Sequence, residues 1–305
     1  MHRITIPMAL LELGMLAGVG TLVAVRHRAA LGQPLRWVER GDGEPVYVFL
    51  HGLGGTHRYW LSQLADYAPP GRLLFADLLG FGDSPRPWFR HTVERHVERL
   101  HARLADCRDI TLVGHSLGAA LALAYAARHS QHVHRLVLLS LPYFGDEAAA
   151  YRWLRQTPEG WLFTNVALMT LACVVTRGLL GSVLPYLRPD LPREVAQDAV
   201  KHSWMASTTS LWDVVYRHDF QADANALGEA IPVLCIHGAR DMTVPADSAC
   251  KLAAGRRNWT TVTLPEVDHH PWLREPRLCQ SLIFGATADP PIIASSANAP
   301  LPQPE

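Results

Sequence analysis

The chain of 305 residues has no excess of either charge, because lysine and arginine total 28 and aspartate and glutamate also total 28. This balance, and the lack of any known nucleic-acid-binding motif, argue against a nucleic-acid partner. Cysteine is scarce: the five residues are an odd number and include no Cys-x-x-Cys pair. We therefore expect neither a disulfide framework nor a metal site, and free thiols suit a reducing compartment.

The N-terminal segment lacks a clean membrane-spanning pattern. Residues Ile4–Val25 are long enough to cross a bilayer, but Glu12 would lie near the middle, where a carboxylate is costly. The uninterrupted part, Leu13–Val25, favours a packed helix or a signal segment, and Arg26-His27-Arg28 follows in place of a cleavage site. We expect a helix within residues 1–30 of a cytoplasmic protein, and membrane association through residues 4–25 stays open.

What the chain does contain is 49% hydrophobic residues and an alternation of short apolar runs with helical patterns. This alternation predicts an α/β fold with a mostly parallel central sheet flanked by helices. Strands are expected at 35–40, 46–50, 72–76, 110–113, 133–140, 231–237 and 261–264. Helices are expected at 92–107, 117–129, 245–257 and after Pro276.

The alternation stops between Leu141 and Gly228, where helical patterns, prolines and aromatics occur without a clear strand. A loop of that length is not left structureless inside a compact domain. We therefore predict a helical cap insertion at residues 141–228, within an α/β core made of residues 31–140 and 229–286. The tail, residues 287–305, is rich in proline, alanine and serine and is expected to be disordered.

The segment Gly114-His115-Ser116-Leu117-Gly118 lies between an apolar strand and a helix. In this context Gly-x-Ser-x-Gly is typical of a tight turn that holds a nucleophilic serine above the strand end. The helix that follows offers free N–H groups to a developing oxyanion. Because Gly-x-Ser-x-Gly also occurs by chance, an inert serine in a plain βα turn is the alternative interpretation.

A glycine-rich loop, His51-Gly52-Leu53-Gly54-Gly55, follows the strand expected at 46–50. The N–H groups of Leu53 and Leu117 would together make a two-donor oxyanion hole. Taken alone, the loop could equally be a plain flexible connection.

A serine hydroxyl needs a base, and the base needs an orienting acid. Asp241 and the pair His269-His270 follow the strands expected at 231–237 and 261–264, at the strand ends where open α/β sheets place their sites. Each residue alone is more often a turn or capping residue. Their occurrence together after the serine favours the catalytic interpretation.

These segments, with Asp77-x-x-Gly80-x-Gly82-x-Ser84, resemble the α/β-hydrolase superfamily, in particular its esterase and lipase-like members with a helical cap. The resemblance covers most of residues 35–285. It implies Ser116 as nucleophile, Asp241 as orienting acid and His269 as base, with the backbone of Leu53 and Leu117 as oxyanion hole and no cofactor.

The resemblance leaves several alternatives open. Asp268 stands where the family usually has glycine, His270 is a second candidate base, and Asp146 is a second candidate acid. Asp77 belongs to a turn that is structural in the family.

The expected function is hydrolysis of a small apolar ester or thioester through an acyl-enzyme intermediate. The acyl group would lie against the apolar run Val166–Val175 with Trp161, Phe163 and Trp204. The alternatives are an acyltransferase, a carbon–carbon bond hydrolase or a lyase with the same residues, or a receptor-like module without turnover. The sequence leaves the oligomeric state undetermined.

Overall fold

The computed structural model describes residues 8–285 except 66, 68, 70 and 178–182, with side chains from Gly20 onward. The tail at 287–305, predicted to be disordered, lies outside the described residues. So does the beginning of the apolar segment at 4–25.

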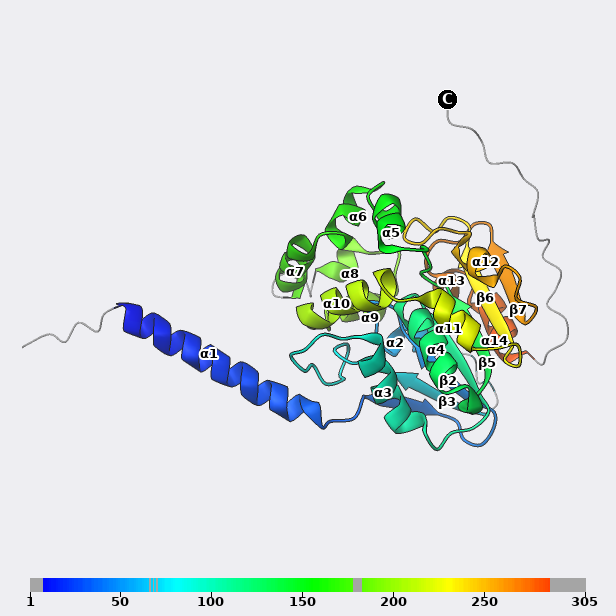
Figure 1. Ribbon diagram of the computed structural model, residues 1–305, viewed down its shortest axis with the longest axis horizontal. Helices are drawn as coiled ribbons and strands as arrows, with labels where there is room; N and C mark the ends of the chain where they lie inside the picture. Colours follow the sequence, from blue (N-terminus) through cyan, green and yellow to red (C-terminus); the bar gives the residue numbers. More distant parts are fainter. Residues whose placement is uncertain (1–7, 66, 68, 70, 178–182, 286–305) are drawn as a thin grey trace, which may run out of the picture.

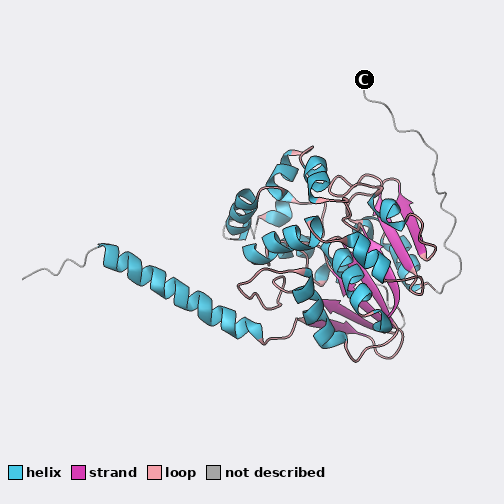
Figure 2. Ribbon diagram, in the orientation of Figure 1, coloured by secondary structure: helices cyan, strands magenta, loops and turns pink. Residues whose placement is uncertain are grey.

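A single sheet of seven strands runs through the described part of the chain in the order β1-β3-β2-β4-β5-β6-β7 (Figures 1 and 2). β1 is antiparallel to β3, and every other neighbouring pair is parallel. Parallel neighbours place their carboxyl ends at one edge, so the loops after β2, β4, β6 and β7 can meet there. The strands are β1 Trp37–Arg40, β2 Val46–Leu50, β3 Arg72–Ala76, β4 Ile110–His115, β5 Val133–Leu139, β6 Val233–Gly238 and β7 Trp259–Leu264.

Helices cover both faces of the sheet, as a parallel sheet requires. All five residues of β2 are buried, and they alternate between the two faces. Val46, Val48 and Leu50 belong to an apolar cluster with α3 and α4, whereas Tyr47 and Phe49 belong to a second cluster with α2 and α14. The flanking helices are α2 Arg58–Leu61, α3 Val93–Leu104, α4 Leu117–Arg128, α12 Ser248–Ala253, α13 Pro271–Arg274 and α14 Pro276–Phe284.

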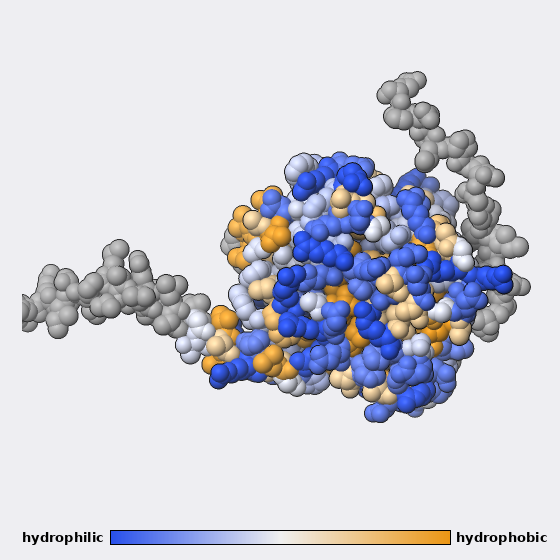
Figure 3. All heavy atoms as spheres, in the orientation of Figure 1, coloured by the Kyte–Doolittle hydropathy of each residue, from blue (hydrophilic) through white to orange (hydrophobic). Residues whose placement is uncertain are grey.

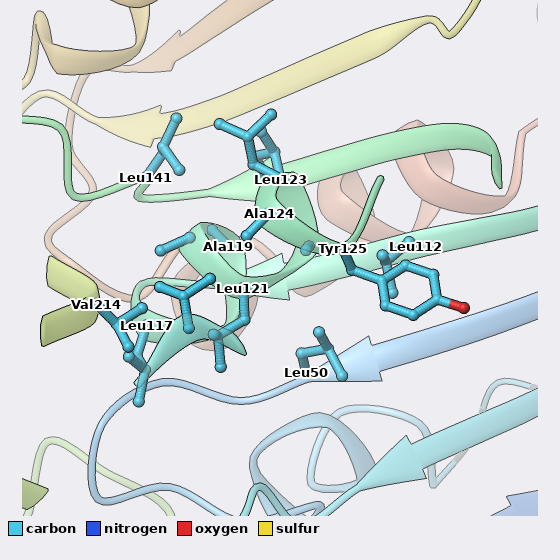
Figure 4. Close-up of a cluster of buried hydrophobic side chains, with 14 of the residues drawn as sticks. Leu50, Leu112, Leu117, Ala119, Leu121, Leu123, Ala124, Tyr125, Leu141 and Val214 are labelled. Atoms are coloured by element: carbon cyan, nitrogen blue, oxygen red, sulfur yellow. The ribbon is translucent and has the colours of Figure 1, made fainter. Parts of the chain in front are cut away.

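Helix α4 passes through the middle of the first cluster. Its residues from Leu117 to Ala126 are all buried, because the helix is alanine-rich and apolar on every side. Figure 4 shows Leu121 and Tyr125 of this helix beside Leu50 of β2 and Leu112 of β4. This packing fixes the N-terminus of α4, and with it the position of Ser116.

Between β5 and β6 the described residues form helices joined by loops, with one isolated bridge between Phe81 and His202. Several hydrogen bonds join this segment to the loops that follow β2 and β3. Thr56 Oγ1 donates to Asp198 Oδ2 at 2.6 Å, and the Gly82 N–H donates to the Lys201 carbonyl at 2.7 Å. The helices are α5 Glu147–Leu154, α6 Pro158–Phe163, α7 Val166–Val175, α8 Leu184–Leu187, α9 Arg193–Asp198, α10 Trp204–Ser210, a π-helical turn Leu211–Tyr216 and α11 Phe220–Ala226.

Helix α1, Met8–Leu31, precedes the sheet and extends away from the body (Figure 1). Its C-terminal end is held by the loop before α3, where the Trp88 N–H donates to His27 Nδ1 at 3.0 Å. Across residues 8–285, leaving out the gaps given above, no helix has both the length and the apolar character needed to cross a membrane.

Candidate active site

Ser116 lies in a strained turn between β4 and α4. Its backbone angles are φ 50° and ψ −116°, a conformation that residues other than glycine rarely adopt. The turn is tight because its two glycines leave no room for a side chain. A Cβ on Gly114 would lie 2.3 Å from the Gly118 carbonyl oxygen, and one on Gly118 would lie 2.2 Å from the Leu50 carbonyl oxygen. The tight turn predicted from the Gly-x-Ser-x-Gly pattern is therefore present.

The loop after β2 lies directly against this turn. A Cβ on Gly52 would come within 2.7 Å of His115 Nδ1 and 3.3 Å of Ser116 Cβ, so only glycine fits there. The backbone N–H groups of Leu53 and Leu117 have no hydrogen-bond acceptor within the described residues. The N–H of Leu117 belongs to the first turn of α4, whose donors have no partner inside the helix. The geometry thus brings two candidate oxyanion donors to the neighbourhood of Ser116.

Asp241 and His269 come together at the same edge, from the loops after β6 and β7. His269 Nδ1 lies 2.7 Å from Asp241 Oδ2. The other carboxylate oxygen of Asp241 accepts the N–H groups of Thr243 and Val244 at 2.8 and 2.9 Å. These bonds hold the carboxylate in a fixed orientation toward His269.

Asp241 is almost fully buried, and burial alone would raise its pKa. The adjacent imidazoles of His269 and His237 outweigh that effect and hold the pKa of Asp241 well below its usual range. An ionised carboxylate can only accept hydrogen bonds, so the proton of neutral His269 must be on Nδ1. Nε2 is then unprotonated and available as a base.

The backbone of His269 is fixed to the serine turn. Its carbonyl oxygen accepts hydrogen bonds from His115 Nε2 at 2.8 Å and from Ser140 Oγ at 3.1 Å. The rings of His115 and His269 are 5.0 Å apart between centroids. Within the described residues the Ser116 hydroxyl makes no hydrogen bond of its own to His269. Such bonds are often long in a free enzyme and shorten when substrate binds.

Neither of the alternative residues, His270 and Asp146, takes part in the contact between Asp241 and His269. His270 turns toward Tyr59 and His115, and burial lowers its pKa to about 3, so it is a weak base. Asp146 caps α5 by accepting the Ala149 N–H at 2.6 Å.

Two further aspartates act within turns. Asp77 accepts the His57 N–H and His57 Nδ1–H at 2.8 Å and the Asp83 N–H at 2.9 Å, as expected for a structural residue. Burial opposes this ionised form, but the bonds from His57 and Asp83 lower the pKa of Asp77 to about 2. Asp268, at the position where the family has glycine, accepts the His270 N–H at 2.9 Å and pairs with Arg274 at 2.6 Å.

The sequence analysis missed His237, which is buried at the end of β6. Its Nε2 lies 3.2 Å from Asp241 Oδ2, the oxygen that also binds His269. Its place at the carboxyl end of a central strand, four residues before Asp241, was an available signal. Ser140 and His115, which hold the His269 carbonyl, were also missed as site residues.

Most of the residues predicted to contact the acyl group are exposed on the surface of the protein. Trp161 and five apolar residues of α7, Val166, Leu168, Leu171, Val174 and Val175, are exposed. Phe163 and Trp204 pack partly buried against the main cluster. Because α7 is apolar on all sides, the sequence could not indicate which side would face the body, and only the side with Met169 and Cys173 does.

Histidine, cysteine and acidic side chains form no group of three or more suited to a metal ion in the part of the chain that the structure describes. The chemistry available at this site is that of a serine in a strained turn, an Asp–His pair and free backbone donors. Together with the mostly parallel sheet, these features define a protein of the α/β class, and the site has the arrangement that is typical of serine hydrolases.

Comparisons with known proteins agree with this class. The family model described as alpha/beta hydrolase fold matches residues 45–276. The chain is 25% identical over 232 residues to a 2-hydroxy-6-oxo-6-(2'-aminophenyl)hexa-2,4-dienoic acid hydrolase from Metapseudomonas resinovorans, covering 72% of this chain and 76% of that protein. It is 28% identical to the AB hydrolase superfamily protein YisY from Bacillus subtilis, covering 80% and 91%.

Among solved structures, a hydrolase from Pseudomonas aeruginosa PA01 has the same fold, with a TM-score of 0.65, 23% identity, and coverage of 83% of this chain and 94% of that one. The chain belongs to the α/β-hydrolase family. It is a hydrolase-type enzyme with a seven-stranded, mostly parallel sheet across its described residues.

Proposed function

We propose that the protein is a serine hydrolase that cleaves an ester or thioester of an apolar acyl group through an acyl-enzyme intermediate on Ser116. The observation that carries this proposal is the 2.7 Å contact between His269 Nδ1 and Asp241 Oδ2, at the sheet edge where the strained Ser116 lies. An imidazole held in this tautomer is the base that a serine nucleophile requires.

In the proposed reaction, Ser116 Oγ attacks the acyl carbonyl carbon while His269 Nε2 takes the hydroxyl proton. The charge on the carbonyl oxygen is stabilised by the N–H groups of Leu53 and Leu117. Asp241 stabilises the imidazolium ion, which then protonates the leaving alcohol or thiol. Water attacks the acyl-enzyme with His269 again as base, and the acid and free Ser116 are released.

The helical segment at residues 141–228 is proposed to act as a cap over Ser116. The contacts Thr56–Asp198 and Gly82–Lys201, between loops at the sheet edge and this segment, support that role. Phe163 and Trp204, partly buried in the main cluster, are the candidate residues of this segment for contact with an apolar acyl group. We also propose a cytoplasmic location, since all five cysteines are free.

One comparison favours a second candidate function, carbon–carbon bond hydrolysis. The relative from Metapseudomonas resinovorans is named for a substrate that carries a keto group and no ester. The same serine, base and oxyanion donors could act on a ketone of this kind. Acyl transfer or elimination would use the same residues, with water excluded from the acyl-enzyme or with no acyl-enzyme formed.

The experiment is labelling with a tagged fluorophosphonate, together with turnover of p-nitrophenyl esters of increasing chain length. We expect Ser116→Ala to abolish labelling and to lower kcat/KM by about 10³-fold or more, because the nucleophile is lost. Ser281→Ala, on the exposed side of α14, is the matched control, since its hydroxyl only bonds the Leu278 carbonyl.

Each outcome separates the candidates. Labelling and ester turnover that both require Ser116 support the esterase proposal, and the preferred chain length measures the acyl site. Labelling without ester turnover favours the carbon–carbon, transfer or elimination reactions. Folded wild-type protein that is not labelled would exclude an activated serine and favour a binding module.

A further inference from the structure

Helix α7 exposes an apolar surface that the proposed reaction does not use. The helix packs on α6 and α10 through Met169 and Cys173. On the opposite side Leu171 is 59% exposed and Val174 is 55% exposed. A helix that is apolar on all sides is normally buried, and a contiguous exposed apolar patch marks an interaction site.

The C-terminal half of α1 adds to this surface. Leu22 and Val25 are 51% and 59% exposed. Figure 1 shows α1 leaving the body on the side where α7 lies. Figure 3 shows hydrophobic residues over α7 and again where α1 joins the body. We call α7 and residues 20–31 of α1, together with the cleft described next, the α1–α7 face.

A cationic cleft of about 560 Å³ is bounded by α1, the loop before α3, Arg177 and the start of α10. Arg26, Arg86 and Arg177 line it, and none of the described lining residues is acidic; Asp83 and Asp77 interact electrostatically with Arg86 from outside the lining. Arg177 lies two residues beyond the end of α7, so the cleft adjoins the apolar patch.

Two details of the cleft fit an anionic partner. Arg86 Nε is buried without a hydrogen-bond partner among the described residues, and burial together with the nearby Arg177 lowers the pKa of Arg86. Trp88 and Trp204 meet edge to face at the same cleft, with ring centroids 5.4 Å apart. Tryptophan is the side chain typically found at the boundary between lipid and water.

We propose that the α1–α7 face docks this enzyme on an anionic phospholipid bilayer. In this arrangement the exposed side chains of α7 and α1 enter the boundary between headgroups and acyl chains, and the cleft arginines contact lipid phosphates. This location is independent of the catalytic role proposed for Ser116.

The charge of the cleft selects this occupant over a second copy of the chain. A two-fold dimer would place the same surface on both sides of the contact, so arginine clefts would face each other without acidic partners in the lining. A free phosphate would satisfy the arginines but would leave Leu171 and Val174 in water. An anionic bilayer satisfies both parts of the face.

The experiment is flotation of the full chain with vesicles of phosphatidylcholine alone or with roughly 30 mol% phosphatidylglycerol. We expect the wild type to float with the anionic vesicles and to be released at about 0.5 M salt. The double variant L171S/V174S should bind the anionic vesicles at least about tenfold more weakly, because two apolar side chains are lost from the contact. R26Q/R177Q should reduce binding to the level seen with neutral vesicles.

Matched variants separate these effects from misfolding. L171M/V174M keeps both positions apolar, and Arg257→Gln removes one exposed charge at the turn between α12 and β7. Both should float like the wild type, and circular dichroism should show the same fold for all variants.

Three results would overturn the proposal. In the first, the wild type fails to float with anionic vesicles. In the second, L171S/V174S and R26Q/R177Q float as well as the wild type, which would place binding elsewhere in the chain. In the third, light scattering shows a dimer that L171S/V174S dissociates, in which case a second copy covers this face.

Discussion

Asp241 Oδ2 is approached by two histidines, at 2.7 Å from His269 Nδ1 and 3.2 Å from His237 Nε2. A carboxylate accepts the Nδ1–H of His269, whereas an amide can also donate and so permits the wrong tautomer of His269. The proposed role of Asp241 therefore depends on its charge and its acceptor geometry, and Asp241→Asn changes both while keeping the shape.

We predict that Asp241→Asn lowers kcat for p-nitrophenyl esters by about 10³- to 10⁴-fold with little change in KM. Steady-state kinetics at neutral pH measure this, and thermal unfolding verifies that the variant is folded. Asp146→Asn is the matched control because that side chain caps α5. A large loss in the Asp146 variant with a small loss in the Asp241 variant would identify Asp146 as the acid.

The adjacent histidines give a second prediction at this scale. Of these two, only His269 contacts Asp241, and the pKa of His270 is lowered to about 3 by burial and by the charge of His269. His269→Ala should lower kcat by about 10³-fold or more, whereas His270→Ala should lower it by about tenfold or less through altered packing. Equal losses would mean that the two rings share the role of base.

At this scale the sequence could predict residues whose position follows from the order of strands. Ser116, Asp241 and His269 follow the parallel strands β4, β6 and β7, and the structure brings Asp241 and His269 into contact. His237 was missed because a histidine near the end of an apolar strand is also compatible with a core position, and its spacing to Asp241 alone does not distinguish the two. Its approach to Asp241 depends on how the chain turns after β6.

Among the elements, the turn between β4 and α4 is tightly constrained by its neighbours. A Cβ on Gly118 would lie 2.2 Å from the Leu50 carbonyl oxygen and 2.6 Å from the His51 carbonyl oxygen. Both contacts are backbone atoms of β2 and its loop, which cannot move without disturbing the sheet. The glycine therefore couples the position of Ser116 to the packing of α4 on β2.

We predict that Gly118→Ala destabilises the fold by about 1–3 kcal/mol or more and abolishes fluorophosphonate labelling. Chemical unfolding and labelling measure the two effects. Gly32→Ala is the matched control, since a Cβ there meets no atom within 4 Å. Labelling of the Gly118 variant at the wild-type level would show that the turn tolerates a side chain.

Elements with a clear period were predictable, and those without one were not. β2 and β3 have the expected bounds, and the other strands differ only at their ends. The helices between β5 and β6 could not be separated in advance because the segment has prolines and aromatics without a regular period. The outward side of α7 could not be predicted, because a helix that is apolar on all sides does not indicate which side is buried.

For the whole molecule, buried histidines determine how stability depends on pH. Burial lowers the pKa of His91 and His202 to about 4 and that of His270 to about 3. In the unfolded chain each titrates near its ordinary value of about 6.5. Between about pH 6.5 and pH 4 the unfolded chain therefore binds more protons, and the stability of the fold decreases as pH falls.

We predict that His202→Asn reduces the slope of unfolding free energy against pH by up to about 1.4 kcal/mol per pH unit between about pH 4 and 6.5. The lowered pKa of Asp77, about 2, adds a further loss only below about pH 4, where that carboxylate is protonated first in the unfolded chain. Urea unfolding at a series of pH values measures the slope. His134→Asn, at an exposed position in β5, is the control. An unchanged slope in the His202 variant would show that His202 takes up a proton in the folded state as readily as in the unfolded chain.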